Sequence, residues 1–305
     1  MTKLNILPSQ EEENSKGRFP SWLRKSLPKG KELFKTHKIL EKYRLNTVCE
    51  EAKCPNRSEC YHRKTATFLA LGKACTRACG FCDIDFSKTP KAPEEDEPLR
   101  IALSSKELGL EHVVITMVAR DDLADKGASH IVKIIQEIRK HTSSSVEVLT
   151  SDFSGDFSAL DLVLEAKPEV FNHNLETVRR LSPKVRHKAE YDRTLSLLQR
   201  AKESKKVAFV KSGMMVGLGE KKEEVYESLQ DLQKVGCDIV TIGHYLQASK
   251  NKLRVKAFIS PEEFEDYAKY GESIGIPYVY SGPFVRSSYN ASLIKNFVQN
   301  SLVSS

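Results

Sequence analysis

The sequence predicts an α/β fold, specifically a partial parallel α/β barrel of six or seven βα units. Short β-rich stretches alternate with helical patterns, which is typical of parallel strands joined by helical crossovers. No G-x-G-x-x-G sequence follows the first of these stretches, which disfavours the alternative, a doubly wound open sheet. In a barrel of this kind, functional groups are expected beyond the carboxyl ends of the strands.

Seven stretches are expected to form the strands. They are apolar or rich in the residue types that favour extended structure. In chain order they are residues 65–71, 112–118, 145–150, 169–174, 207–217, 238–245 and 277–282. Their succession along the chain gives the barrel its predicted number of units.

Helical patterns occupy the segments between the strands. Residues 129–141 place four isoleucines on one helical face, and residues 223–236 end at a glycine suited to a helix C-terminus. A further helix is expected to begin with Ser260 as its N-cap and Pro261 at its first position. Before the first strand, only residues 31–43 show a short helical pattern.

The composition is that of an ordinary globular protein. The 305 residues are 40% hydrophobic and 29% charged, enough for one large domain or two small ones. No apolar run approaches the roughly 20 residues of a membrane span, and the first residues resemble neither a signal peptide nor a transit peptide. We therefore expect a cytoplasmic protein without membrane attachment. In that compartment seven cysteines indicate metal binding or catalysis more than disulfides.

The net charge of +7 is concentrated near the N-terminus. Residues 1–15 are polar and expected to be disordered. Between Lys16 and Arg44, ten lysines or arginines stand against two glutamates, so the rest of the chain is close to neutral. This basic segment is either a solvated arm or a docking surface for an acidic partner. Nucleic acid fits less well, because no aromatic platform interleaves the charges.

Three cysteines follow the first predicted strand in a C-x3-C-x2-C pattern: Cys75, Cys79 and Cys82. A structural zinc site normally takes four protein ligands, and so does a four-iron cluster. No fourth cysteine lies nearby. The triplet therefore leaves one coordination position open, at the place where a barrel carries its active site.

A second triplet, Cys49, Cys54 and Cys60, lies upstream with wider spacing and again lacks an obvious fourth ligand. The six cysteines could form two incomplete zinc sites, one shared zinc site or two iron–sulfur clusters with three thiolates each. Disulfides are the least expected alternative. Spacing alone leaves zinc and iron–sulfur clusters open.

The C-x3-C-x2-C pattern, with Phe81 before its last cysteine and a parallel barrel after it, resembles the radical S-adenosylmethionine superfamily. Within it, the chain resembles the lipoyl synthase family from about Pro20 to Tyr289. The resemblance is carried by "LNTVCEEAKCPNRSEC", "RKTATFLALGKACTRACGFCDI", "HVVITMVARDDLADKGA", "FNHNLETV", "KSGMMVGLGE", "TIGHYLQ" and "SGPFVRSSYNA". Two cysteine triplets combined with a C-terminal RSSY make it a specific one.

The resemblance implies two 4Fe-4S clusters and S-adenosyl-L-methionine. Cys75, Cys79 and Cys82 would bind three irons of the first cluster, and S-adenosylmethionine would occupy the fourth iron. An electron delivered there would release a 5′-deoxyadenosyl radical. The expected contacts to the cosubstrate are Phe81, Thr116, Asn172 and Asn174. The intervening His173 is expected to be structural.

The second, auxiliary cluster would be held by Cys49, Cys54 and Cys60 together with a serine of the RSSY motif. We expect Ser288 to be that ligand, with Ser287 as the near alternative. An alkoxide is a harder ligand than a thiolate and suits iron–sulfur less well, which marks a point where the cluster can open. Arg286 would sit beside this cluster and balance its negative charge.

The reaction implied is insertion of two sulfur atoms at carbons six and eight of a protein-bound octanoyl-lysine, with sulfide from the auxiliary cluster. These carbons are unactivated, so a radical is chemically required. The implied partners are octanoylated lipoyl carrier domains, namely the E2 subunits of 2-oxoacid dehydrogenases and the glycine cleavage H protein. A reduced flavodoxin or ferredoxin type electron donor and cluster-assembly proteins are also implied. Neither nucleic acid nor a membrane is expected as a partner.

Three alternatives remain at this point. The chain could be another sulfur-inserting radical enzyme, a non-enzymatic iron–sulfur electron carrier, or a zinc-bound nucleic-acid module. The RSSY motif disfavours the first, and an electron carrier would need no barrel of this size.

The expected organisation has four parts. Residues 1–15 form a disordered N-terminus, and residues 16–61 form an extension with the auxiliary cysteines. Residues 62–283 form the barrel, and residues 284–305 form a C-terminal segment with the RSSY motif. The two extensions are expected to cover the barrel mouth.

The chain departs from the usual family pattern at four positions, Ala119, Ser151, His244 and Ala248. None is an expected cluster ligand. The departures therefore concern contacts to the cosubstrate or substrate.

Overall fold

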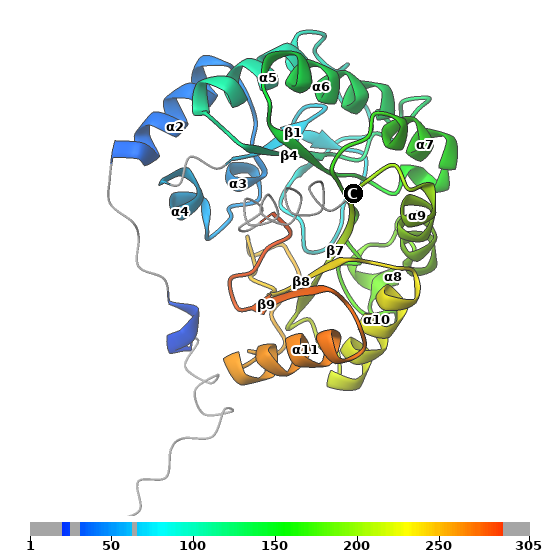
Figure 1. Ribbon diagram of the computed structural model, residues 1–305. Helices are drawn as coiled ribbons and strands as arrows, with labels where there is room; N and C mark the ends of the chain where they lie inside the picture. Colours follow the sequence, from blue (N-terminus) through cyan, green and yellow to red (C-terminus); the bar gives the residue numbers. More distant parts are fainter. Residues whose placement is uncertain (1–19, 25–30, 63–65, 289–305) are drawn as a thin grey trace, which may run out of the picture.

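The computed structural model describes residues 20–24, 31–62 and 66–288. Its centre is one parallel sheet in which the order of the strands in space follows their order in the chain (Figure 1). The seven strands are β1 (Thr67–Ala70), β4 (His112–Met117), β5 (Ser145–Leu149), β6 (Val170–Asn172), β7 (Phe209–Val216), β8 (Ile239–His244) and β9 (Tyr278–Gly282). The edge strands β1 and β9 are not hydrogen-bonded to each other. The predicted partial parallel barrel is therefore confirmed.

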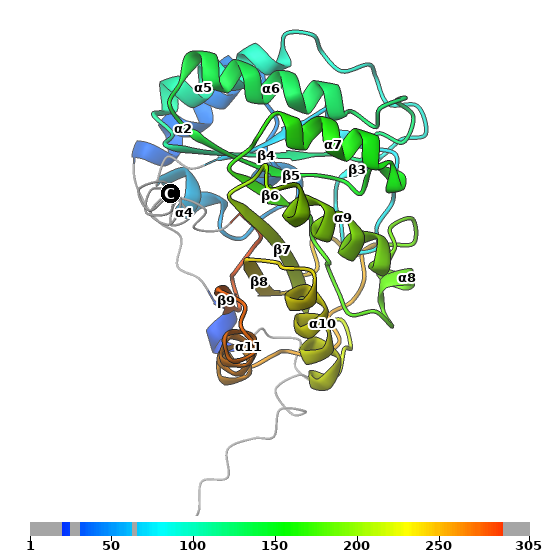
Figure 2. The same cartoon turned by 45° about the vertical axis from the view of Figure 1, so that its right-hand side comes forward.

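Helices surround the outer face of this sheet, as Figures 1 and 2 show from two directions. They are α5 (Glu97–Leu108), α6 (Ala128–His141), α7 (Phe157–Glu165), α8 (Ser182–Val185), α9 (Tyr191–Ser204), α10 (Lys222–Lys234) and α11 (Pro261–Ser273). There are also two short 3-10 helices, η1 (Ser21–Leu23) before the barrel and η2 (Phe153–Gly155) after β5. No helix in the described ranges is long and apolar enough to cross a membrane.

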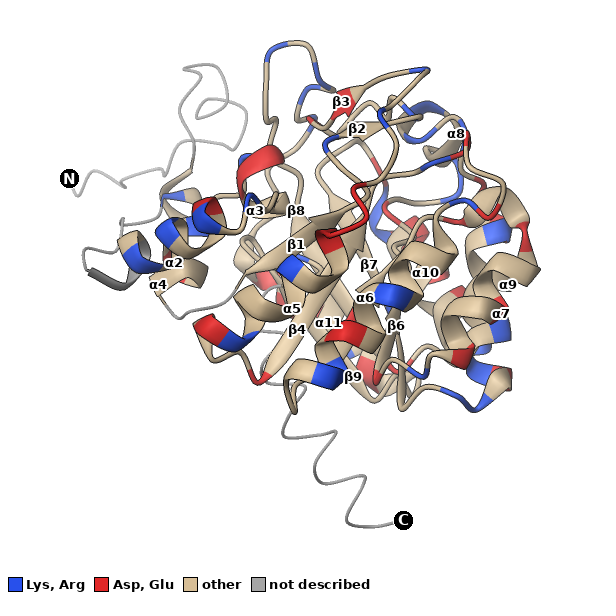
Figure 3. Cartoon of the chain, turned by 90° about the horizontal axis from the view of Figure 1, so that it is seen from above, with Lys and Arg blue, Asp and Glu red and all other residues tan. Residues whose placement is uncertain are grey.

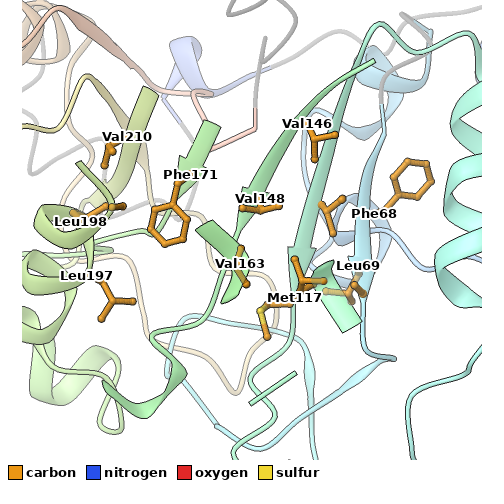
Figure 4. Close-up of a cluster of buried hydrophobic side chains, with 14 of the residues drawn as sticks. Phe68, Leu69, Met117, Val146, Val148, Val163, Phe171, Leu197, Leu198 and Val210 are labelled. Atoms are coloured by element: carbon orange, nitrogen blue, oxygen red, sulfur yellow. The ribbon is translucent and has the colours of Figure 1, made fainter. Parts of the chain in front are cut away.

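The core lies between the sheet and the helices. Figure 4 shows side chains from strands, such as Val148 and Phe171, meeting side chains from helices, such as Val163 and Leu197. All four are at most 1% exposed. Burying each such side chain stabilises the fold by about 1.5–3 kcal/mol. This contact holds the strands in place and so fixes the positions of the residues at their carboxyl ends.

The predicted strands and helices are confirmed where their patterns were strong. All seven predicted strands occur, and the four isoleucines of α6 are buried against the core. Ser260 accepts a hydrogen bond from the backbone N–H of Glu263, as an N-cap does, and Pro261 opens α11. Gly236 follows α10 with a φ of 76°, the left-handed conformation that glycine allows.

The segment before the barrel contains more helix than the sequence predicts. Besides α2 (Lys31–Lys42) it forms α3 (Val48–Glu51) and α4 (Arg57–His62), which are too short to show a helical period. Tyr61 is 1% exposed, and its hydroxyl lies 2.8 Å from Thr47 Oγ1. Helix α3 lies beside β1 and α4 packs against α2, on the side where the barrel is open (Figure 1).

The segment after β9 turns back across the barrel. The backbone N–H of His244 donates to the Pro283 carbonyl at 3.3 Å, which holds the segment to the end of β8. Asn56 Nδ2 donates to the Phe284 carbonyl at 2.7 Å. Residues from the two ends of the described chain therefore meet directly.

Candidate functional site

A cavity of about 510 Å³ lies at the carboxyl ends of the barrel strands. Thr116 of β4, Gly213 of β7 and Gly243 of β8 form part of its wall. The six cysteines of the two sequence triplets all line it: Cys49, Cys54, Cys60, Cys75, Cys79 and Cys82. The structure thus brings both triplets to the place where a barrel of this type carries its chemistry.

The first triplet lies in the loop after β1. This loop forms a small parallel pair, β2 (Ala74–Cys75) with β3 (Asp85–Phe86), that the sequence analysis missed. Burial raises the pKa of Cys79 to about 12, and the neighbouring Cys82 acts in the same direction. Burial also raises the pKa of Cys82, to about 11, with a further contribution from Cys75. The three thiols are therefore close enough to influence one another.

Arg77, between the first two cysteines of this triplet, ties the loop to the barrel. Its guanidinium makes ion pairs with Asp121 at 2.7 Å and with Asp152 at 2.6 Å. Burial alone would raise the pKa of Asp121, but its contact with Arg77 holds that pKa well below its usual range. These carboxylates follow β4 and β5, so the loop is anchored to two neighbouring strand ends.

The second triplet is placed by the two short helices α3 and α4 of the N-terminal segment. Cys49 belongs to α3 and Cys60 to α4, and the backbone N–H of Cys54 donates to the Cys49 carbonyl at 3.1 Å. Thr47 caps α3 by accepting from the backbone N–H of Glu50. Burial raises the pKa of Cys49 to about 12, and Cys54 and Cys60 add to this effect. These thiols are also near neighbours.

The C-terminal segment brings Arg286, Ser287 and Ser288 to the same cavity. Burial lowers the pKa of Arg286, while the nearby Cys54 acts against that shift. The Ser287 hydroxyl is engaged, because it donates to Asn174 Oδ1 at 2.5 Å. Within the described part of the chain, the Ser288 hydroxyl makes no such bond and remains available to the cavity. Tyr289, the last residue of the RSSY motif, lies outside the described residues.

The donor set fits iron–sulfur clusters. All seven cysteines are free thiols, and the six that line the cavity are soft ligands suited to iron–sulfur centres. Within the described ranges, no three His, Cys, Asp or Glu side chains converge closely enough to hold a single metal ion. A four-iron cluster does not require such convergence, because each thiolate binds a different iron. The seventh cysteine, Cys237, is 2% exposed and lies in the core.

Three of the four expected cosubstrate contacts line the cavity, and one does not. Phe81, Thr116 and Asn174 line the cavity. Asn172 is fully buried and is absent from the lining, and its Nδ2 donates to Glu147 Oε1 at 2.8 Å. His173 has both ring nitrogens engaged, by the Thr150 carbonyl and the Thr194 hydroxyl, which agrees with its expected structural role.

The sequence analysis missed Glu176, a carboxylate that lines the cavity. Burial raises its pKa, and Arg186 and a hydrogen bond from Asn174 oppose that rise. Its position two residues beyond Asn174, in the loop after β6, was the available signal. A half-buried carboxylate beside the first triplet can accept hydrogen bonds from a cationic ligand.

All four departures from the usual family pattern line the cavity: Ala119, Ser151, His244 and Ala248. His244 is the best defined. Its ring stacks on Phe258 with centroids 5.6 Å apart, and its Nδ1 lies 2.6 Å from the Tyr245 carbonyl oxygen. These positions shape the wall of the cavity and leave the cysteines unchanged.

Comparison with known proteins assigns the family. The model of the radical SAM superfamily matches residues 69–232, and that of the N-terminal domain of lipoyl synthase matches residues 6–54. A lipoyl synthase from Protochlamydia amoebophila is 59% identical, over 96% of this chain and 93% of its own length. The chain belongs to the lipoyl synthase family. A second member, from Chlamydia abortus, is 51% identical over 93% of this chain and 91% of its own length.

Two solved structures have folds similar to that of this lipoyl synthase family member. Methylornithine synthase superposes with a TM-score of 0.53 at 16% identity, covering 77% of this chain and 80% of its own. A Streptococcus suis protein bound to S-adenosylmethionine gives 0.56 at 13% identity, covering 70% of this chain and 49% of its own. The family is one of radical enzymes that use S-adenosylmethionine and 4Fe-4S clusters. The expected cofactor classes are therefore confirmed.

Proposed function

We propose that this chain inserts sulfur at carbons six and eight of an octanoyl group attached to a lysine of a carrier protein. The observation that carries the proposal is that both cysteine triplets and Ser288 line one cavity. A radical source and a sulfur source must act on the same carbon, so they have to face the same space. The likeness to lipoyl synthases over almost the whole chain favours this reaction over that of another sulfur-inserting radical enzyme.

In this proposal Cys75, Cys79 and Cys82 hold the first cluster. With S-adenosylmethionine and one electron from a reductant, that cluster would supply a 5′-deoxyadenosyl radical able to take hydrogen from unactivated carbon. The chain's own task is to position the loop, which Arg77 does through its two ion pairs. Apolar wall residues such as Leu149 and Met117 exclude water from the reacting groups.

Cys49, Cys54, Cys60 and Ser288 would hold the auxiliary cluster, which would supply the sulfur. Arg286 lies next to Cys54 and contributes a positive charge beside these anionic ligands. Phe81, Thr116, Asn172 and Asn174 all stay predicted contacts to the cosubstrate. Of these, Phe81, Thr116 and Asn174 line the cavity.

The proposed division of labour follows the chain. Residues 16–61 supply the auxiliary cysteines, residues 62–283 the barrel, and residues 284–305 the serine ligand. The contact between Asn56 and Phe284 supports an arrangement in which both extensions close over the barrel mouth.

The proposed partners are octanoylated lipoyl carrier domains, an electron donor of the flavodoxin or ferredoxin type, and proteins that rebuild the auxiliary cluster. A cytoplasmic location belongs to the same proposal. The assay that tests the function is anaerobic turnover of an octanoyl-lysyl carrier peptide with S-adenosylmethionine and a reductant. We expect a brown protein with about eight irons per chain that gives a product heavier by two sulfur atoms. A colourless protein that binds zinc and leaves the peptide unchanged would contradict the proposal.

Basic residues near the auxiliary segment are proposed to guide an acidic carrier. Figure 3 shows lysines along α2, and Lys35 and Lys38 are exposed there. Arg24 is described and exposed, whereas Lys25 and Lys29 of the same basic segment lie outside the described residues.

Charge reversal in the double variant Lys35→Glu/Lys38→Glu is expected to raise the KM for an intact carrier domain roughly two- to tenfold, with less effect on a short octanoyl-lysyl peptide. The difference between the two substrates should shrink as salt rises, because exposed charges are screened. Lys133→Glu, on the exposed face of α6, is the matched control. Equal losses with both substrates at every salt concentration would show that α2 does not guide the carrier.

A further inference from the structure

The C-terminal segment reaches the cavity through a slot formed by two glycines in neighbouring strands. A Cβ at Gly243 of β8 would lie 2.0 Å from the Val285 carbonyl oxygen, a distance that no side chain can adopt. A Cβ at Gly213 of β7 would lie 3.1 Å from Ser287 Oγ and 2.8 Å from Asn174 Oδ1. The missing side chains therefore allow the segment to lie directly on the strands.

Within this slot the Ser287 hydroxyl is held from two sides. It donates to Asn174 Oδ1 at 2.5 Å and accepts from Asn172 Nδ2 at 3.2 Å. A hydroxyl that both donates and accepts in this way has a fixed orientation. We call Ser287, Asn172 and Asn174 the serine latch.

The latch rests on a rigid buried base. Asn172 Nδ2 also donates to Glu147 Oε1 at 2.8 Å, and Lys211 Nζ lies 3.0 and 3.1 Å from the two Glu147 oxygens. Glu147 and Lys211 are at most 1% exposed. Burial alone would raise the pKa of Glu147, but Lys211 lowers it to about 2, so the carboxylate stays charged and bound. On the other side, Asn174 Nδ2 donates to Glu176 Oε1 at 3.0 Å.

We propose that Ser287 is a positioning residue that orients Ser288 toward the auxiliary triplet. This inference rests on the proposed function, in which Ser288 is the fourth ligand of the auxiliary cluster. Ser287 and Ser288 are consecutive residues of one turn, and both line the cavity. A latch that fixes Ser287 against β6 and β7 therefore also fixes the backbone from which the Ser288 hydroxyl reaches the cavity. In this proposal Asn172 and Asn174 hold Ser287 of the protein itself, in place of the cosubstrate.

The test uses a chain in which all iron belongs to the auxiliary cluster, the variant Cys75→Ala/Cys79→Ala/Cys82→Ala. After anaerobic reconstitution with iron-57 it should hold about four irons and show the Mössbauer signal of an oxygen-ligated iron. Adding Ser287→Ala should weaken that signal and speed iron loss to a chelator roughly tenfold, because two hydrogen bonds are removed. Ser287→Thr keeps the hydroxyl and should restore both readouts.

Ser281→Ala is the matched control. It makes the same chemical change in β9, at a hydroxyl that is buried and has no hydrogen-bond partner in the described part of the chain. It should behave like the parent, and the thermal midpoint of all variants should be similar.

The outcomes separate the two proposals. A parent variant that binds no iron contradicts the proposed function itself. A parent with four irons whose Ser287→Ala form keeps its signal and its iron overturns the latch alone. An equal effect from Ser281→Ala would also overturn the latch. Ser287→Ala is also made in the chain with all its cysteines. If this variant shows a raised KM for S-adenosylmethionine and unchanged auxiliary iron, Asn172 and Asn174 serve the cosubstrate instead, and the latch is overturned.

Discussion

Replacing Cys75 with alanine is expected to abolish reductive cleavage of S-adenosylmethionine. Cys75 lies at the end of β2 and lines the cavity with Cys79 and Cys82, so its loss leaves only two thiolates for the first cluster. Loss of groups that merely support a metal ligand already costs roughly 10–100-fold. Loss of a ligand itself should reduce cleavage by more than about a hundredfold. The measurement is 5′-deoxyadenosine formed per chain under anaerobic reduction.

Cys237→Ala provides the matched control for this variant. It removes the same thiol group from the core, away from the cavity lining, and should retain cleavage. Unchanged cleavage in the Cys75→Ala protein would remove the basis for assigning the first triplet to the radical source.

Replacing Cys54 with alanine should separate radical formation from sulfur insertion. Cys54 lies in the second triplet, beside Arg286, whereas the loop of the first triplet is anchored independently through Arg77. We expect the variant to contain about half the iron and to form 5′-deoxyadenosine still. Hydrogen abstraction from the octanoyl chain requires only that radical and a positioned substrate. Sulfur insertion should vanish, because its source is lost.

Mass spectrometry of the octanoyl peptide, together with quantitation of 5′-deoxyadenosine and iron, checks this expectation. An octanoyl peptide deuterated at carbons six and eight would report hydrogen abstraction without sulfur insertion, because the label would appear in 5′-deoxyadenosine. A Cys54→Ala protein that still makes the lipoyl product would show that the sulfur comes from elsewhere. Loss of both activities would show that the two cysteine triplets cannot be separated.

The barrel could be predicted because its physical requirements repeat along the chain. Each strand must be apolar enough to lie between helices and the interior, and each long helix must carry an apolar stripe, as α6 does. One interior feature escaped this logic. Glu147 and Lys211 lie in strands β5 and β7, where sequence patterns assign buried positions to apolar residues, and their pairing appears only in three dimensions.

The six cysteines could be singled out by their spacing, whereas the contacts that bring them to one cavity could not be predicted. Nothing in the spacing indicates that α3 lies beside β1 or that α4 packs against α2, because these positions depend on tertiary contacts such as that of Thr47 with Tyr61. The motif position already favoured Ser288 over Ser287 as the ligand. The hydrogen bonds that engage Ser287 could not be predicted, because Asn172 and Asn174 are distant from it in sequence.

The hydrogen bond between Asn56 and Phe284 has a consequence for the order in which the molecule is assembled. Its partners are separated by 228 residues, so the ribosome must make the whole barrel before the bond can form. During that interval Cys49, Cys54 and Cys60 belong to a nascent chain in which the C-terminal segment with Ser288 has not yet been made. Thiols in this state are open to oxidation and to capture of the wrong metal. If Ser288 completes the auxiliary cluster as proposed, the finished cluster can form only after the barrel has been translated, and these three thiols would need protection until then.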